Sequence, residues 1–403
     1  MAKTKNCLLT AAAVSAALVA QSAAAFEFHG YFRSGAGVNS EGGDWVVFQL
    51  PGAGSKYRLG NESQNYGELI FQQDLYKGDD GSYFTYYNRL AFQTEGEANY
   101  SNDRTDFVEN YAEAGNVVGG IFEGAKFWAG KRFYRRHDVH ITDNYFWNNS
   151  GTGGGVEDVD LGFGKLAYAF IRHTQDDPNG NEVVGTSHDF RVYGIGTNPG
   201  GELTLGADVV TQSSDVDAAQ TEGGYRLNVM HFQEDVLGGY NKVDLQYADN
   251  GAGFVGGINT SANADDFSGW MLTEQLVWQG ETFSGQATAV YQEVDNGDTW
   301  MSLGARPTYH INQHVSVALE AGVDQVEPDN GDTRTLTKVT LAPQITPEAD
   351  FWSRPSLRLF FTYADWNDAA QGAAAAGSTL SSTGPFGTDT SGFTYGVQAE
   401  AWW

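Results

Sequence analysis

The chain has 403 residues, a formal net charge of −28 and a single cysteine, Cys7. A chain this acidic lacks the clustered basic surface with which proteins neutralise phosphates, and this argues against a nucleic-acid partner. Glycine accounts for 51 residues and aromatic residues for 13% of the chain, a composition that suits a sheet protein. After residue 25, no apolar run approaches the ~20 residues of a membrane-spanning helix.

The first 25 residues are predicted to be a secretory signal peptide. Lys3 and Lys5 give a positively charged start, an apolar run follows from Leu8 to Ala20, and small residues at 23–25 form a cleavage site. The mature chain is then 26–403, and Cys7 is removed with the signal. An exported protein without a thiol forms no disulfide and no thiolate metal site.

Alternation of apolar and polar residues recurs along the mature chain and predicts strands. Clear examples are residues 283–292, 315–324 and 356–363, and turn-forming clusters of Asp, Asn and Gly separate such segments. No convincing helix is found, and the alanine-rich stretch Ala369–Ser378 is predicted to be a loop.

A two-sheet sandwich would show the same alternation. However, a sandwich of this length should divide into domains, and no boundary is visible. The last predicted strand, Phe393–Trp403, also ends on an aromatic residue, which is typical of outer-membrane barrels. We therefore predict an all-β transmembrane barrel, and the length accommodates roughly 16–18 strands around an aqueous lumen.

Five aromatic rings lie on the polar side of the predicted barrel wall. In such a wall, residues of one parity face lipid and those of the other face water. Each ring alone can be explained as an interface or packing aromatic, but five together favour a row of flat apolar surfaces beside charged groups. That pairing suits a sugar, which has C–H faces and hydroxyl edges. The five rings are Tyr31, Tyr66, Tyr240, Trp352 and Trp402.

Several segments together carry a family resemblance. The most specific is Trp128–His140, and Phe28–Tyr31, Ser55–Glu62, Trp352–Pro355 and the terminal Trp402-Trp403 accompany it. With these segments the chain resembles the maltoporin family over nearly all of residues 26–403. The resemblance implies an 18-stranded antiparallel barrel with an inward-folded constriction loop. It further implies a non-enzymatic channel, without cofactors, for facilitated diffusion of maltose and maltodextrins.

The resemblance also implies roles for individual residues. The family's aromatic slide would comprise the five rings above together with Tyr100, on a loop that reaches a neighbouring subunit. A polar lane and constriction would comprise Arg33, Arg58, Glu68, Arg136, His140, Asp143 and Tyr145. Two positions depart from the pattern: Val108 stands near a family arginine, which Arg104 would have to replace, and Asn148 stands where an aspartate is frequent.

Partners and alternatives follow from the same reasoning. The expected partners are maltodextrins, outer-membrane lipid and lipopolysaccharide, two further copies of the chain in a homotrimer, and a periplasmic maltose-binding protein. The runner-up functions are a porin for another oligosaccharide, such as sucrose or β-glucosides, and a general diffusion porin. An outer-membrane hydrolase would need a Ser/His pair near one rim, and alternation supplies none. His137 and His140 are interpreted as hydrogen-bonded structure, so no metal site is predicted.

Overall fold

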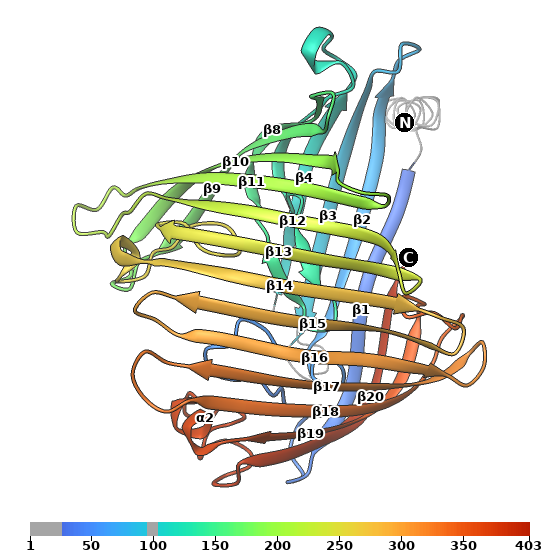
Figure 1. The fold of residues 1–403 in the computed structure, drawn as a ribbon, viewed down its shortest axis with the longest axis vertical. Helices are drawn as coiled ribbons and strands as arrows, with labels where there is room; N and C mark the ends of the chain where they lie inside the picture. The colour runs from blue at the N-terminus through green and yellow to red at the C-terminus, as the bar shows by residue number, and fades with distance from the viewer. Residues whose placement is uncertain (1–25, 95–103) are drawn as a thin grey trace, which may run out of the picture.

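The computed structural model describes residues 26–94 and 104–403, most of which lie in β-strands (Figure 1). The strands are β1 (Phe26–Asn39), β2 (Asn65–Lys77), β3 (Tyr83–Thr94), β4 (Arg104–Gly115), β5 (Lys126–Arg132), β6 (His137–Val139), β7 (Asn144–Trp147), β8 (Gly151–Asp160), β9 (Lys165–Asp176), β10 (Glu182–Gly196), β11 (Gly201–Ser213), β12 (Gly224–Val236), β13 (Gly239–Asn250), β14 (Ser268–Gln279), β15 (Phe283–Val294), β16 (Thr299–His310), β17 (Val315–Glu327), β18 (Arg334–Ile345), β19 (Ser356–Trp366) and β20 (Ser391–Trp402). The helical elements of the described residues are the short 3-10 helices η1 (Gly120–Phe122) and η2 (Ala264–Asp266) and the α-helix α2 (Asp368–Ala373). Within these ranges, no helix is long and apolar enough to cross a membrane.

Eighteen of the strands in the described part of the chain form one antiparallel sheet that closes on itself. β1 is hydrogen-bonded to β2 on one side and to β20 on the other. The other strands pair in chain order, except that β5 pairs with β8 because β6 and β7 pair only with each other. Closure satisfies the backbone hydrogen bonds that an open sheet would expose to lipid. The prediction of an 18-stranded barrel is confirmed.

The two ends of the barrel differ in the length of their connections. Residues 237–238 join β12 to β13 at one end, whereas residues 367–390 join β19 to β20 at the other. In outer-membrane barrels the short turns face the periplasm and the long loops face outward. β1 begins and β20 ends at the short-turn end, on the right of Figure 1, and α2 lies at the long-loop end.

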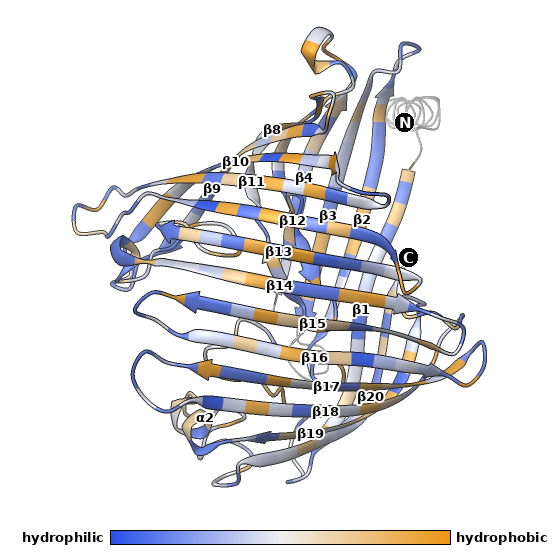
Figure 2. Cartoon of the chain, in the orientation of Figure 1, coloured by the Kyte–Doolittle hydropathy of each residue, from blue (hydrophilic) through white to orange (hydrophobic). Residues whose placement is uncertain are grey.

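Hydrophilic and hydrophobic residues alternate along the strands of the barrel wall, as the banding in Figure 2 shows. On β17, Val315, Leu319 and Val323 are exposed on the outer face, while Glu320 and Asp324 are buried on the inner face. An outward apolar row is required where the wall contacts acyl chains. The predicted period-two alternation is therefore observed in the wall.

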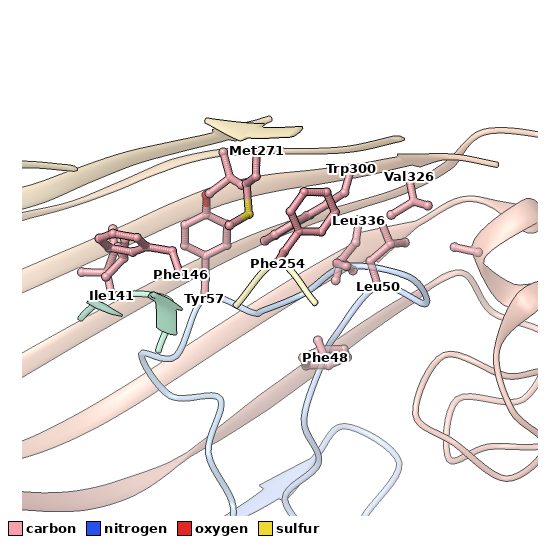
Figure 3. Close-up of a cluster of buried hydrophobic side chains, with 14 of the residues drawn as sticks. Phe48, Leu50, Tyr57, Ile141, Phe146, Phe254, Met271, Trp300, Val326 and Leu336 are labelled. Atoms are coloured by element: carbon pink, nitrogen blue, oxygen red, sulfur yellow. The ribbon is translucent and has the colours of Figure 1, made fainter. Parts of the chain in front are cut away.

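Part of the barrel interior is filled by chain segments that fold inward from the long-loop end. Residues 45–62 and 133–150 both contact the inner wall: Leu59 N donates to Glu320 Oε1 at 3.0 Å, and Ile141 N donates to Gln286 Oε1 at 3.0 Å. Their apolar side chains join inward-facing wall residues in one buried cluster (Figure 3). The cluster includes Phe48, Leu50, Tyr57, Ile141, Phe146, Phe254, Met271, Trp300, Val326 and Leu336. The lumen is therefore occupied on the side of β12–β19.

The prediction of a loop over Ala369–Ser378 is wrong at its start. The helix α2 covers Asp368–Ala373, and the side chain of Asn367 accepts a hydrogen bond from Ala370 N at 3.0 Å. An asparagine at the N-cap satisfies one of the free N–H groups of a helix end. The short alanine-rich stretch forms a helix because it carries this cap and packs Ala370 into the buried cluster.

Candidate functional site

A cavity of about 590 Å³ lies in the lumen against the inner face of β1, β2, β3 and β20. The inward-folded segment 133–150 closes its other side. Its lining contains three of the predicted rings and every residue of the predicted polar lane. These are Tyr31, Tyr66, Trp402, Arg33, Arg58, Glu68, Arg136, His140, Asp143 and Tyr145.

Four aromatic rings follow one another along this side of the lumen. The ring centroids of Tyr66 and Tyr31 are 6.0 Å apart, those of Tyr31 and Trp402 are 6.5 Å apart and nearly parallel, and those of Trp402 and Trp352 are 6.5 Å apart. Strand register explains the first steps, because Tyr31 on β1 pairs with Glu68 on β2 and with Trp402 on β20. We call these four rings the aromatic file.

Trp352 reaches the file from a different element than predicted. The sequence places it on a strand of the barrel wall, but β19 begins only at Ser356, and Trp352 lies in the turn that precedes it. Its backbone N donates to Asp350 Oδ1 at 2.6 Å, which orders the turn. The inward orientation of Trp352 therefore comes from turn geometry rather than from strand parity.

Of the two remaining predicted rings, Tyr240 does not join the file. Tyr240 is the second residue of β13 and packs against Phe232 at 5.4 Å between centroids, and Lys242 Nζ lies 5.8 Å from the Tyr240 ring. None of the ring contacts of the described residues links Tyr240 to Trp352. Tyr100 lies outside the described residues.

Glu400 on β20 is the centre of the charged network beside the file. This buried carboxylate contacts three guanidinium groups: Arg58 at 3.1 Å, Arg354 at 3.0 Å and Arg358 at 2.9 Å. It also accepts a hydrogen bond from the Tyr31 hydroxyl at 3.1 Å. Arg354 in turn lies 4.1 Å from the Trp402 ring. The Glu400 carboxylate thus holds the guanidinium groups beside the rings of Tyr31 and Trp402.

A second group of charges lies at the other end of the file, around Tyr66. Its hydroxyl donates to Glu68 Oε1 at 2.6 Å, and Glu68 also pairs with Arg89 at 3.1 Å. Arg33 stacks on the Tyr66 ring at 5.2 Å and pairs with Glu62 at 2.9 Å. These bonds fix the orientation of Tyr66, because the ring is held both at its edge and on its face.

The inward segment presents His140 to the rings. Its imidazole packs against Trp352 and Trp402 at centroid distances of 5.1 and 5.8 Å. Its Nδ1 lies 3.3 Å from Arg58 Nη1, and its Nε2 lies 3.3 Å from Arg354 Nη2. Burial, together with the positive charge of Arg58, holds the pKa of His140 well below its usual range. The imidazole is therefore neutral at physiological pH.

Other polar side chains of the inward segment line the cavity without ion pairs among the described residues. The Arg136 guanidinium lies between Phe133 and Tyr145, at 3.8 and 4.6 Å from the ring centroids. Asp143, at φ 54°, faces the same space. Burial raises the pKa of the Tyr145 phenol to about 12, so this hydroxyl remains a hydrogen-bond donor. These groups are available to a polar solute.

Several site residues were missed at the sequence level. Arg89, Glu400 and Arg354 belong to the charged network but are not among the residues predicted for the polar lane. Arg89 lies beside a bulge in the β3–β4 ladder, where Val108 is the unpaired residue. Arg104 was expected to replace the family arginine missing near Val108, and Arg89 supplies a guanidinium to this part of the cavity.

His137 and His140 point to different neighbours. His137 stacks on Phe146 at 6.1 Å, whereas His140 packs against Trp352 with its ring tilted, so the two imidazoles do not converge. Within residues 26–94 and 104–403, no three His, Cys, Asp or Glu side chains are grouped as a metal site would require. The candidate site can therefore stack flat apolar surfaces and exchange hydrogen bonds.

Comparison with known proteins places the chain in a family. The family described as LamB porin matches residues 26–403. One similar solved structure is the trimer form of OmpT from Vibrio cholerae, with 10% identity, coverage of 95% of this chain and 100% of that chain, and a TM-score of 0.44. Another is an OmpF complex with daunomycin from Salmonella typhi, with 9% identity, coverage of 94% of this chain and 98% of that chain, and a TM-score of 0.45. An anion-selective porin from Comamonas acidovorans is also similar, with 10% identity, coverage of 94% of this chain and 100% of that chain, and a TM-score of 0.41. The family match carries the assignment: this chain belongs to the LamB porin family and is a β-barrel porin of the bacterial outer membrane.

Proposed function

We propose that this porin passes maltose and maltodextrins by facilitated diffusion along the aromatic file. The observation that carries the proposal is the unbroken sequence Tyr66, Tyr31, Trp402 and Trp352 on one side of the lumen. An apolar ring exposed to an aqueous lumen gains by covering itself with another apolar surface. The C–H faces of consecutive glucose units provide such a surface.

The energetics of the file suit transport. An aromatic contact contributes roughly 0.5–1.5 kcal/mol beyond the area that it buries. A series of weak and similar contacts lets a solute bind and also move on, which a single strong site would prevent. The charged groups that line the same cavity, among them Arg33, Glu68 and Arg136, exchange hydrogen bonds with sugar hydroxyls as the chain advances.

The inward segment 133–150 provides the narrowing. Arg136, Asp143 and Tyr145 of this segment line the same cavity of about 590 Å³ as Tyr66, Tyr31 and Trp402. A solute that passes must lie flat against the rings while its edges meet these polar groups. This arrangement favours an extended chain of pyranose rings over compact solutes of equal mass.

Planar-bilayer recording tests the proposal. Maltohexaose should block the ion current of the unmodified channel, and Trp402→Ala should weaken the block by roughly fivefold through the loss of one stacking contact. Tyr395→Ala is the matched control, because Tyr395 lies on the same strand but faces outward and is 45% exposed. If maltohexaose blocks the ion current of the two variants equally well, the aromatic file does not bind the sugar. A sugar panel that includes sucrose decides between maltodextrin and other oligosaccharides.

The porin is further proposed to assemble as a homotrimer through the outer face of β1–β5. This part of the wall carries polar groups at lipid-facing positions. The Ser34 hydroxyl, for example, donates to Asn65 Oδ1 at 2.6 Å. The outer face of β17–β19, in contrast, is apolar at Leu319, Leu341 and Leu359. Light scattering of the detergent-solubilised protein measures the number of subunits.

A further inference from the structure

A second cavity, of about 370 Å³, lies in the lumen nearer the short-turn end. It is formed by inward-facing residues of β2, β3 and β4 together with the first residues of β1. Its lining comprises Glu27, Gln72, Asp74, Lys77, Tyr83, Thr85, Tyr87, Tyr111 and Glu113. We call it the turn-side cavity. The aromatic file does not pass through it, because the file crosses from β1 to β20.

The turn-side cavity continues directly from the candidate site. Ile70 and Arg89, which line the candidate site, pair across β2 and β3. The next inward-facing pair towards the short turns is Gln72 with Tyr87, and both residues line the turn-side cavity. Arg89 joins the two spaces, since its Nη2 donates to the Tyr87 hydroxyl at 2.9 Å. Beyond Glu68, a solute can therefore move along the wall in two directions, either along the aromatic file or into the turn-side cavity.

Aromatic rings line this second direction too. Tyr87 and Tyr111 are stacked with centroids 5.0 Å apart and planes at 27°, and Tyr83 lies on the same face of β3 as Tyr87. All three are partly exposed rather than buried. They are not lipid-interface residues, because Tyr86, which lies beside Tyr87 on β3, is the ring that faces outward. Like the rings of the aromatic file, these three rings expose apolar surface to an aqueous lumen.

The polar groups around these rings are mainly acceptors. Glu27, Asp74 and Glu113 contribute three carboxylates, against the single ammonium of Lys77. Glu113 accepts from the Tyr83 hydroxyl at 2.8 Å, and Asp74 pairs with Lys77 at 2.7 Å. Each carboxylate retains capacity to accept further hydrogen bonds. The Tyr111 hydroxyl has no hydrogen-bond partner within the described residues, so it is free to bind a solute.

We propose that the turn-side cavity is a second sugar-binding subsite, at which one or two pyranose rings of an oligosaccharide stack on Tyr87 and Tyr111. This inference rests on the proposed function, since it assumes that the solute is a sugar. The carboxylates accept hydrogen bonds from the sugar hydroxyls, and Tyr111 donates one. By its position, the subsite binds a chain that leaves the candidate site toward the short turns, or one that enters from that end.

Side-resolved current recording tests the subsite. Maltohexaose is added either at the long-loop end or at the short-turn end of a single inserted channel, and association and dissociation rates are taken from the blocking events. In the double variant Tyr87→Leu/Tyr111→Leu, association from the short-turn end should slow by roughly fivefold or more, as expected for the loss of one or two stacking contacts. Association from the long-loop end should stay unchanged. Tyr86→Leu is the matched control, because it removes an outward-facing ring from the same strand.

Two outcomes overturn the subsite, and a third separates its failure from that of the proposed function. The subsite is overturned if maltohexaose associates from the short-turn end at equal rates in the double variant and in the control. A crystal of the unmodified chain, soaked in maltotriose, that shows sugar on the aromatic file and none on Tyr87 and Tyr111 also overturns it. If maltohexaose does not block the unmodified channel from either end, the proposed function itself fails.

Discussion

Replacing Glu400 by glutamine should destabilise the barrel far more than the loss of one surface charge would. The substitution keeps the shape of the side chain but removes the anion that Arg58, Arg354 and Arg358 share. Arg58 keeps Glu62 as a partner at 3.0 Å, whereas Arg354 and Arg358 have no other ion pair among the described residues. Their guanidiniums are nearly buried, with exposed side-chain fractions of 5% and 4%. Removing one partner of a buried ion pair costs about 3–5 kcal/mol.

Urea unfolding in lipid vesicles, followed by tryptophan fluorescence, measures this cost. Glu27→Gln serves as the control, because Glu27 is half exposed and its pairing with His29 at 3.5 Å should contribute only ~0–1 kcal/mol. The double variant Glu400→Gln/Arg358→Gln should recover part of the lost stability, since it removes one of the unpaired cations. The reasoning is refuted if Glu400→Gln lowers the free energy of unfolding by no more than Glu27→Gln does.

Three further predictions concern the inward segments. Arg136→Ala should weaken maltohexaose block by roughly tenfold, the cost of one charge-assisted hydrogen bond, and unchanged block would contradict this. Because the pKa of His140 is held well below its usual range, acidification from pH 8 to about 6 adds no charge there. The reversal potential in a salt gradient should therefore change with pH equally in the unmodified chain and in His140→Gln, and a difference would show that His140 titrates. Gly322→Val would place a Cβ 2.1 Å from the Tyr57 ring, so segment 45–62 should be displaced from the wall. Single-channel conductance should then rise. Unaltered conductance would show that the Tyr57 ring moves aside instead.

The inward faces of the strands could be predicted because strand geometry leaves little freedom. Once Tyr31 is placed on a strand, the two-residue period decides which face it occupies, and the same holds for Tyr66 and Trp402. The structure places all three on the lumen side. Trp352 also faces the lumen, but from a turn, where no periodicity applies. Its inward orientation was predicted for the wrong reason.

Pairings across the barrel could not be predicted from alternation. Parity places Glu400 inside, but its contact with Arg58 depends on how segment 45–62 folds back into the lumen. The apolar interior was missed for a related reason. Trp300 and Leu336 occupy inward positions where alternation predicts polar residues, and they are 1% and 3% exposed because inward segments cover them. A single strand's pattern carries no information about a cover supplied by distant residues.

The apolar cluster also explains why the charged network lies where it does. The inward segments fill the lumen against β12–β19 with close-packed side chains, so a permeating solute is displaced toward β1–β4 and β20. Ion pairs that line a narrowed space are less screened by water than those in a wide pore, and their attraction is correspondingly stronger. Arg136 and Tyr145 line the same cavity as Tyr66, Tyr31 and Trp402 of the aromatic file. The buried cluster and the site therefore depend on each other, since loosening the first would widen and rehydrate the second.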